Sequence, residues 1–262
     1  MPVKLLFIGD IIGKPGRQVL SRELHKLVDR YFIDVVIANG ENSAGGFGIT
    51  EEVSQELTKA GVHLITSGNH VWDKKDSLDF LEKSPLLVRP ANYPEGTPGR
   101  GAAIVATPGG TKVAVLNLEG RVFMNNLDCP FRTADREIAK LKEITPIILV
   151  DFHAEASSEK GALGWYLDGR VSAVVGTHTH VQTADERILS DGTAYITDVG
   201  MTGAFDSVIG MRKDEAIRKF LTQLPTRFEV AKKDLRLNAV FIAIDERSGK
   251  ALTIERINLC SD

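Results

Sequence analysis

Several apolar runs of this sequence end in side chains of the types that bind metal ions. Each of five strand-like runs is followed, within a few positions, by a carboxylate, an amide or an imidazole group. These side chains are Asp10, Glu41 with Asn42, Asn69 with His70, His153, and His178 with His180. Open α/β sheets bind ligands at the carboxyl ends of their strands, so we expect these side chains to lie at one common edge.

Any one of these residues also has a simpler explanation. An Asp or Asn next to a glycine is usually a turn residue, and a histidine after a strand is most often a hydrogen-bonded loop residue. Four of the six histidines nevertheless belong to the set. The other two histidines have simpler explanations. His25 lies among charged residues of an expected helix and fits a solvated position, and His63 precedes an apolar run and fits the edge of the core. Recurrence over five strands therefore favours one common site.

Carboxylate, amide and imidazole ligands together suit a site for two metal ions. Two cations about 3.5–4 Å apart, joined by a bridging carboxylate, can hold an attacking hydroxide and a phosphoryl oxygen. Imidazole and oxygen ligands without thiolate are typical of iron, manganese or zinc. Cys129 and Cys260 lack a CxxC spacing, so we expect neither a disulfide framework nor a thiolate metal site.

The segment His178-Thr179-His180 places both imidazole groups on one side if the chain is extended there, so that they could bind neighbouring ions. A purely structural metal site is the alternative to a reactive one. Structural sites are usually closed and four-coordinate. A set of eight candidate side chains exceeds four ligands and instead indicates an open dinuclear site.

Strand-like and helix-like segments alternate along the chain and must position these side chains. The expected strands are Val3–Ile8, Asp34–Ala38, Val62–Thr66, Ala102–Ala106, Lys112–Asn117, Ile147–Phe152, Val171–Val175, Glu186–Leu189, Ala194–Thr197, Leu235–Ile244 and Ala251–Ile257. The expected helices are Arg17–Arg30, Thr50–Ala60, Lys75–Leu81, Thr133–Glu143 and Asp214–Leu224. Thr50 is well placed as an N-cap.

This order of elements predicts an α/β fold in a single domain over residues 1–262. The alternating pattern up to about residue 185 predicts parallel strands with helices outside, and the hairpin-rich remainder predicts a second sheet. Two packed mixed sheets flanked by helices would accommodate both parts. The sequence contains no internal repeat, low-complexity tract or obvious linker that would divide it.

Composition and charge exclude several classes of protein. The longest apolar runs, such as Pro146–Val150, are far too short to span a bilayer, and the N-terminus lacks a signal-peptide cleavage pattern. We therefore expect a cytoplasmic protein that does not enter membranes. The net charge of −3 argues against an extended nucleic-acid-binding surface.

Two motifs in the set resemble those of calcineurin-like metallophosphoesterases. They are Gly68-Asn69-His70, which is followed by Asp73, and Gly176-Thr177-His178-Thr179-His180. The first two motifs of that family are usually Asp-x-His and Gly-Asp-x-x-Asp. This chain instead has Gly9-Asp10-Ile11-Ile12-Gly13 and Gly40-Glu41-Asn42-Ser43.

These departures, together with the segments 44–50 and 151–155, resemble the YmdB-type subfamily of the metallophosphoesterases. Its bacterial members are described as 2′,3′-cyclic-nucleotide 2′-phosphodiesterases. The resemblance runs from Lys4 to at least Gly203 and implies the α/β/β/α sandwich of metallophosphoesterases.

The resemblance also implies a role for each residue of the set. One ion would be held by Asp10, Glu41, Asn42 and His180. The other would be held by Glu41, Asn69, His153 and His178, which makes Glu41 the bridging ligand. His70 corresponds to the proton donor of the family. Members often carry iron, so iron is favoured as the divalent or trivalent metal, and manganese is the alternative.

We therefore expect a metal-dependent phosphodiesterase that acts on a small phosphodiester, a 2′,3′-cyclic nucleotide. A metal-bridging hydroxide would attack phosphorus, and His70 would protonate the departing ribose oxygen. The alternatives are a phosphomonoesterase such as a nucleotidase, and a metal-dependent regulator that binds nucleotide or RNA. The sequence leaves the oligomeric state open, a homo-oligomer included.

Three further segments have no function assigned by the sequence. Gly45–Gly48 fits either a phosphate-binding loop or a flexible entry to the next helix. Phe123–Phe131 and Thr202–Arg212 fit either a lid or an oligomer contact. Asp198 follows an expected strand and fits either a turn residue or a partner of a ligand histidine.

Overall fold

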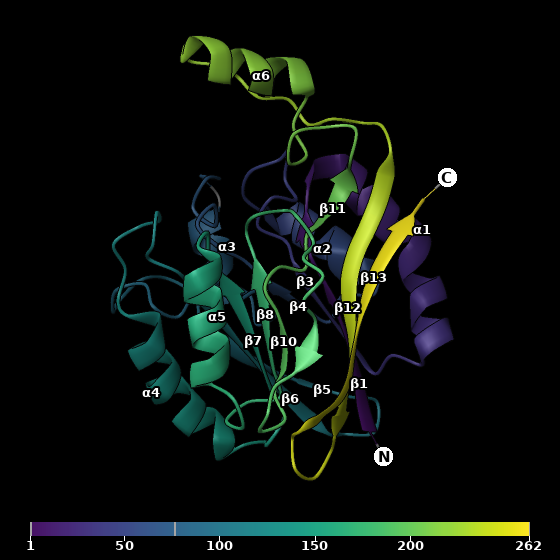
Figure 1. Ribbon diagram of the computed structural model, residues 1–262, viewed down its shortest axis with the longest axis vertical. Helices are drawn as coiled ribbons and strands as arrows, with labels where there is room; N and C mark the ends of the chain where they lie inside the picture. Colours follow the sequence, from purple (N-terminus) through teal and green to yellow (C-terminus); the bar gives the residue numbers. More distant parts are fainter. Residues whose placement is uncertain (1, 76, 262) are drawn as a thin grey trace.

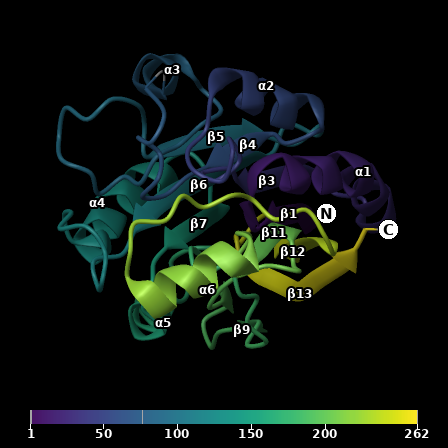
Figure 2. The same cartoon turned by 90° about the horizontal axis from the view of Figure 1, so that it is seen from above.

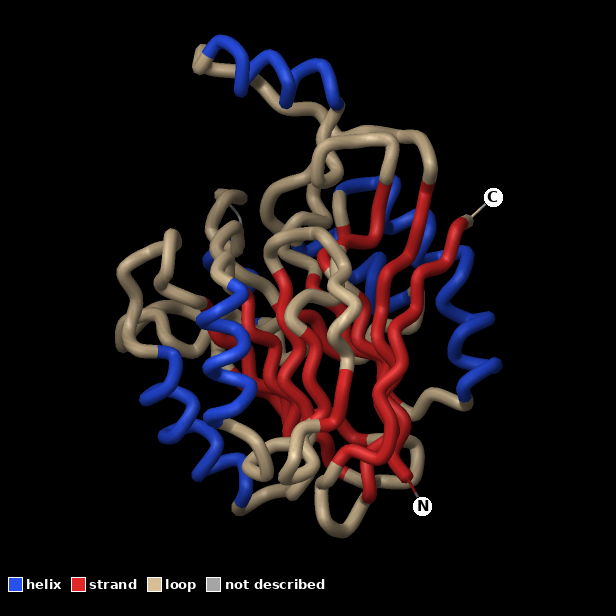
Figure 3. Tube along the Cα trace, in the orientation of Figure 1, coloured by secondary structure: helices blue, strands red, loops and turns tan. Residues whose placement is uncertain are grey.

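Two β-sheets pack face to face, and helices cover the outer side of each sheet (Figures 1 and 3). This computed structural model describes residues 2–75 and 77–261 of the chain. The four layers are the α/β/β/α arrangement that the sequence predicts, so the predicted fold class is confirmed.

The first sheet has the strand order β2-β11-β12-β1-β3-β4, and β13 pairs with β12 beside this path. Its strands are β1 (Pro2–Ile8), β2 (Asp10–Ile11), β3 (Val35–Asn39), β4 (Leu64–Thr66), β11 (Met201–Ala204), β12 (Leu235–Asp245) and β13 (Ala251–Cys260). β1, β3 and β4 run parallel, whereas β12 is antiparallel to β1 and to β13.

The second sheet has the order β5-β6-β7-β8-β10-β9. Its strands are β5 (Ala102–Ala106), β6 (Lys112–Glu119), β7 (Ile148–His153), β8 (Ala173–Thr177), β9 (Arg187–Ile188) and β10 (Ala194–Ile196). β6, β7, β8 and β10 are parallel, and the outer strands β5 and β9 are antiparallel to their neighbours.

Six helices complete the described structure: α1 (Gly13–Tyr31), α2 (Glu51–Lys59), α3 (Ser77–Lys83), α4 (Pro130–Lys142), α5 (Ser157–Tyr166) and α6 (Lys213–Thr222). Within the described residues, no helix is both long and apolar enough to span a bilayer. Thr50 caps α2 as predicted, because its hydroxyl accepts a hydrogen bond from the amide of Val53. The predicted helix Lys75–Leu81 begins later, at Ser77; residue 76 lies outside the described residues.

Three apolar clusters join the four layers. Along β1, Leu6 and Ile8 face the cluster beneath α1 and α2, whereas Leu5 and Phe7 face the cluster between the sheets. A strand buried on both faces must be apolar throughout, which explains the unbroken run at the N-terminus of the sequence. The third cluster packs α4 and α5 on the outer face of the second sheet.

The predicted division of strands between the two sheets is wrong. The C-terminal hairpin of β12 and β13 joins the N-terminal sheet, where Leu5 lies opposite Ile242. The parallel strands β6, β7 and β8 belong to the other sheet. Hydrophobic periodicity shows which faces of a strand are buried but not which distant strand pairs with it, so the sequence pattern could not reveal this exchange.

The strands β2 and β11 and the helix α5 were not predicted from the sequence. The α5 sequence contains Gly161 and Gly164, which weaken its helical pattern. Gly164 is required for close packing, because a Cβ there would lie 2.5 Å from the ring of Tyr195. The short strands β2 and β11 pair with each other at Asp10 and Met201, a long-range contact that no local pattern records.

Lys160 on α5 forms a buried ion pair that links this helix to a loop at the carboxyl edge. Its side chain is 1% exposed, and its Nζ lies 2.6 Å from Oδ2 of Asp198, just after β10. The same carboxylate accepts hydrogen bonds from the amide of Gly200 and from the amide and hydroxyl of Thr179. The buried carboxylate of Asp198 therefore joins three segments, which are the helix α5, the loop with Thr179 and its own loop with Gly200.

We predict that Lys160→Met lowers the free energy of unfolding by about 3–5 kcal/mol, because it leaves the buried carboxylate of Asp198 without its cation. Lys140→Met is the matched control, since Lys140 pairs with Glu137 at the surface and its loss should cost about 1 kcal/mol or less. Urea denaturation measures both values. Equal, small losses in the two variants would contradict this role of the pair.

Candidate metal centre

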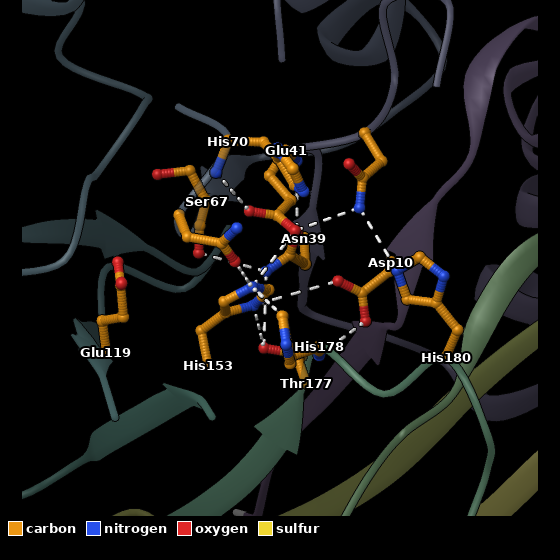
Figure 4. Close-up of polar contacts among 12 residues, drawn as sticks. Asp10, Asn39, Glu41, Ser67, His70, Glu119, His153, Thr177, His178 and His180 are labelled. Atoms are coloured by element: carbon orange, nitrogen blue, oxygen red, sulfur yellow. Dashed lines mark hydrogen bonds and ion pairs between the residues drawn. The ribbon is translucent and has the colours of Figure 1, made fainter. Parts of the chain in front are cut away.

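The predicted ligand residues meet where the carboxyl ends of strands from both sheets come together (Figure 4). Two groups of carboxylate and imidazole side chains there are close enough to hold metal ions, among the residues that the structure describes. The first group is Glu41, His153 and His178, and the second is Asp10, Glu41 and His180. Within each group the ligating atoms all lie within 4.8 Å of one another, and Glu41 belongs to both groups.

The first group gathers around Nε2 of His153, at the end of β7. This atom lies 3.1 Å from Oε1 of Glu41, 3.0 Å from Oδ1 of Asn69 and 3.0 Å from Nδ1 of His178. These four residues are the predicted ligands of one ion. Nε2 of His178 points the other way and lies 3.1 Å from Oε2 of Glu155.

The second group lies on the other side of Glu41. Nδ2 of Asn42 is 3.0 Å from Oε1 of Glu41 and 3.2 Å from Nε2 of His180. Asp10 follows β1 and accepts a hydrogen bond from the amide of His178 through Oδ2. The side-chain nitrogen of Asn42 points toward Glu41 and His180. A flip of this amide group would bring its Oδ1 to the same position.

The two imidazole groups were expected on one side of the chain if that segment is extended. The segment that carries His178 and His180 is not extended. The backbone angle φ is 100° at His178 and 66° at His180. Residues other than glycine rarely adopt positive values of this kind. The two rings therefore turn toward different groups. Strain of this kind persists only where other contacts fix the loop; here Asp198 binds Thr179, and Nδ1 of His180 lies 2.9 Å from the carbonyl oxygen of Ile209.

Buried polar residues beneath the ligands were missed in the sequence analysis. Nδ1 of His153 lies 2.9 Å from the hydroxyl of Thr177, which donates a hydrogen bond to Asp151. Asp151 in turn accepts a hydrogen bond from Asn39. Such partners fix the orientation and tautomer of a ligand histidine. The available signal was a polar residue inside an otherwise apolar strand, as at Asn39 and Asp151.

Glu119 is another missed residue near this edge, at the end of β6 in register with His153. Its side chain is buried, and its Oε2 has no hydrogen-bond partner among the described residues. Burial raises the pKa of Glu119. Asp198, for which the sequence left two roles open, accepts hydrogen bonds from Thr179 and, among the described residues, none from the ring of a ligand histidine.

The charges of the site are strongly coupled. Burial acts to raise the pKa of Glu41, but His153 and His70 outweigh it and lower that pKa to about 2. Burial acts to lower the pKa of His153, yet Glu41, Asp10 and Asp151 raise it to about 9. Burial and the charge on His153 lower the pKa of His178 to about 3. The carboxylates of Glu41, Asp10 and Asp151 therefore favour positive charge at His153, which is the charge that a bound cation would supply.

The residues present fit a pair of bound cations. Burial raises the pKa of Asp10, and its Oδ1 has no hydrogen-bond partner among the described residues, although Nδ1 of His153 lies 3.9 Å away. A buried carboxylate oxygen without a partner is costly unless something positive binds it. The donors are nitrogen and oxygen atoms without thiolate, which suit iron, manganese or zinc.

His70 borders the two groups but belongs to neither. Its Nδ1 lies 2.8 Å from Oδ2 of Asp73, and its backbone amide donates a hydrogen bond to Oε2 of Glu41. The ring of Phe47 contacts it edge-on, with centroids 5.2 Å apart. These contacts fix the ring, and His70 also lines the adjoining pocket.

Comparison with known proteins gives close relatives over nearly the whole chain. A family model described as YmdB-like protein matches residues 6–257. A Bacillus subtilis protein named 2′,3′-cyclic-nucleotide 2′-phosphodiesterase is 54% identical over 99% of this chain and 98% of its own length. A Mycoplasma pneumoniae protein named putative phosphatase/phosphodiesterase is 38% identical over 99% of this chain and 94% of its own.

Two solved structures share this fold. A crystal structure of a hypothetical protein from Thermus thermophilus superposes with a TM-score of 0.93 at 42% identity, covering 99% of this chain and all of that one. A structure described as a novel phosphatase from Mycoplasma pneumoniae also gives a TM-score of 0.93, at 37% identity over 100% of this chain and 95% of its own.

Gly68 provides a test of the metal centre, because a Cβ added there would lie 2.3 Å from the ring of His153 and 2.4 Å from Oε2 of Glu41. We predict that Gly68→Ala displaces these side chains and weakens metal binding by about 10- to 100-fold. Equilibrium dialysis with manganese measures the change. In the control Gly109→Ala, the added methyl group meets only the Thr107 hydroxyl at 3.8 Å, and binding should not change. Unaltered affinity in a folded Gly68→Ala protein would contradict the assignment.

Proposed function

Because the chain belongs to the family of YmdB-like proteins, we propose that it is a phosphodiesterase that hydrolyses 2′,3′-cyclic nucleotides. The relative with 54% identity carries the name of this activity, and the two chains cover each other almost completely. Both named relatives are hydrolases of phosphate esters, and so is this chain.

One observation carries the proposal: two donor groups share the buried carboxylate of Glu41 and adjoin a pocket that His70 also lines. A structural metal site is usually closed and four-coordinate. These groups instead border a pocket of about 460 Å³. A substrate can therefore approach the side chains that would hold the metals.

We assign Asp10, Glu41, Asn42 and His180 to one ion, and Glu41, Asn69, His153 and His178 to the other. This assignment is supported by the distances around Glu41 and by the unpartnered Oδ1 of Asp10. When bound, two such cations lower the pKa of a water molecule and stabilise the negative charge on the transferred phosphoryl group. These donor types suit iron, manganese or zinc. We propose iron, the metal that the resemblance to the family implies, with manganese as the alternative.

The protein side chains have two tasks in this reaction. The buried ligands, together with the residues that hydrogen-bond beneath them, such as Thr177 and Asp151, hold the reacting phosphodiester group in one position. His70 lies outside the ligand groups, and because Asp73 binds its Nδ1, Nε2 is the ring nitrogen that we assign to the substrate. We assign His70 as the general acid: its Nε2 gives a proton to the ribose oxygen as that oxygen leaves phosphorus.

The competing assignment is a phosphomonoesterase, because the Mycoplasma pneumoniae relative is named both phosphatase and phosphodiesterase. A protein that only binds nucleotide or RNA for regulation is less well supported, since it has no need of a general acid beside open ligand groups. The reaction product distinguishes these assignments.

We predict that the metal-loaded protein converts 2′,3′-cyclic AMP to adenosine 3′-monophosphate and stops there. Cleavage of the bond to the 2′ oxygen leaves the phosphate on the 3′ oxygen, in keeping with the name of the Bacillus subtilis relative. Chromatography of the products, with phosphate release measured in parallel, is the test. Adenosine and free phosphate as the main products would instead support the phosphomonoesterase, and no turnover at all would refute both.

His70→Ala should lower turnover of 2′,3′-cyclic AMP by about 10²–10⁴-fold, because the ribose oxygen then leaves without a proton. Turnover of bis(4-nitrophenyl) phosphate should fall much less, because nitrophenolate is a good leaving group. Metal content should not change. The control is His25→Ala, an exposed position on α1.

The pattern of losses distinguishes a general acid from a ligand. Equal losses on both substrates, or metal lost together with activity, would show that His70 is structural or binds metal. Steady-state kinetics and elemental analysis of the same protein samples give both results.

A further inference from the structure

The lining of the pocket beside the metal centre is of two chemical kinds. The pocket volume is about 460 Å³, which lies within the usual range for a small-molecule site. The polar part of the lining, called here the polar end, consists of Glu41, Asn42, His70, Glu155, His178 and His180. The apolar part, called the apolar end, consists of Phe47, Val208, Ile209, Met211, Phe220 and Phe228, of which Phe47 and Ile209 adjoin the polar end through His70 and His180. A ligand that fills both parts combines an anionic group with a flat apolar group.

The apolar end is built by segments that stand apart from the two sheets. Figures 1 and 2 show α6 beyond the carboxyl edge of the strands, separate from the helices that cover the sheets. The loop before it bears Ile209, whose carbonyl oxygen lies 2.9 Å from Nδ1 of His180. The wall of the pocket is therefore in direct contact with a candidate metal ligand.

Aromatic side chains are prominent in this wall. Phe47 comes from the glycine-rich segment between β3 and α2 and touches the ring of His70. Phe220 comes from α6 and is 75% exposed, and Phe228 follows α6 and is half-buried. Exposed aromatic side chains at a concave site are typical of surfaces that stack on a planar ligand.

We propose that this apolar end is the subsite for the nucleobase, with Phe220 and Phe228 as its specificity-determining residues. This inference rests on the proposed function. In a 2′,3′-cyclic nucleotide the base is attached to the carbon next to the cyclic phosphate, and the two groups project from opposite faces of the ribose. A phosphate held beside Glu41 and His70 thus directs the base away from the metal centre, toward the aromatic wall.

The same geometry gives the kind of selectivity to expect. Stacking accepts every base, because each has a π-face. Lys219 is the charged side chain that α6 contributes to the lining, and its Nζ donates a hydrogen bond to the carbonyl of Gln223. The subsite therefore distinguishes a nucleotide from a phosphodiester without a base, rather than one base from another.

A second copy of the chain is the other candidate occupant, since Ile217, Leu221 and Leu224 on and after α6 are also exposed. The wall formed by Phe220 and Phe228 is nevertheless continuous with the polar end in one pocket. A small ligand that combines both chemistries fills it, whereas an apolar surface of a second copy would leave the polar end unmatched.

The test compares Phe220→Ala and Phe228→Ala with Leu221→Ala. Leu221 is the neighbour of Phe220 on α6, is 79% exposed and is not part of the pocket lining. Calorimetry measures the Kd of the metal-loaded protein for adenosine 3′-monophosphate and for inorganic phosphate. Kinetics are measured with 2′,3′-cyclic AMP and with methyl ribofuranoside 2,3-cyclic phosphate, which has no base.

We expect each phenylalanine variant to weaken binding of adenosine 3′-monophosphate by roughly 5- to 150-fold, the range for loss of one base–aromatic stack. KM for 2′,3′-cyclic AMP should rise in the same proportion. Binding of phosphate and kcat/KM for the base-free substrate should stay within about twofold, and Leu221→Ala should change nothing.

Three results would overturn the proposal. They are unaltered binding in both phenylalanine variants, equal losses on ligands with and without a base, and an equal loss in Leu221→Ala. Light scattering completes the test: a lower oligomer mass in Phe220→Ala with unaltered nucleotide binding would assign this face to a second copy. Selective loss of nucleotide binding in a protein that hydrolyses no cyclic nucleotide would refute the proposed function and leave the subsite standing.

Discussion

The buried carboxylate of Glu41 is the group on which the rest of the site depends. It belongs to both donor groups, it accepts a hydrogen bond from the amide of His70, and it lies 3.1 Å from the ring of His153. Burial of a carboxylate is costly unless positive charge surrounds it. The two sheets satisfy this condition together, because Glu41 follows a strand of one sheet and His153 ends a strand of the other.

This constraint explains several features away from the ligands. The loop of His178 and His180 adopts an unusual backbone conformation so that its two rings reach different groups, and the Lys160–Asp198 pair holds that loop from behind. Gly68 leaves room for the ligands, because any side chain there would meet His153 and Glu41. The loop of His178 and His180 also contacts Ile209 in the wall of the pocket. The metal centre is therefore in direct contact with the surface that we assign to the base.

The sequence predicted the strand-end residues and the four-layer fold because both depend on local patterns. An apolar strand followed by a glycine and a polar residue can be recognised without knowing its neighbours, as at Glu41 and Asn69. Features that depend on long-range pairing were not predictable in this way. They include the return of β12 to β1, the short pair β2–β11 and the hydrogen bonds from Thr177 to Asp151 and His153. The aromatic wall of the pocket joins segments from Phe47 to Phe228, and no local pattern connects them.

Metal content tests most directly whether one carboxylate, that of Glu41, joins two metal sites. Elemental analysis of the reconstituted protein, beside Glu41→Gln and the exposed control Glu51→Gln, gives the number of ions bound per chain. We expect two ions in the wild-type protein and in Glu51→Gln, and the loss of both in a folded Glu41→Gln protein. A single ion in the wild-type protein, or two ions retained in Glu41→Gln, would contradict it.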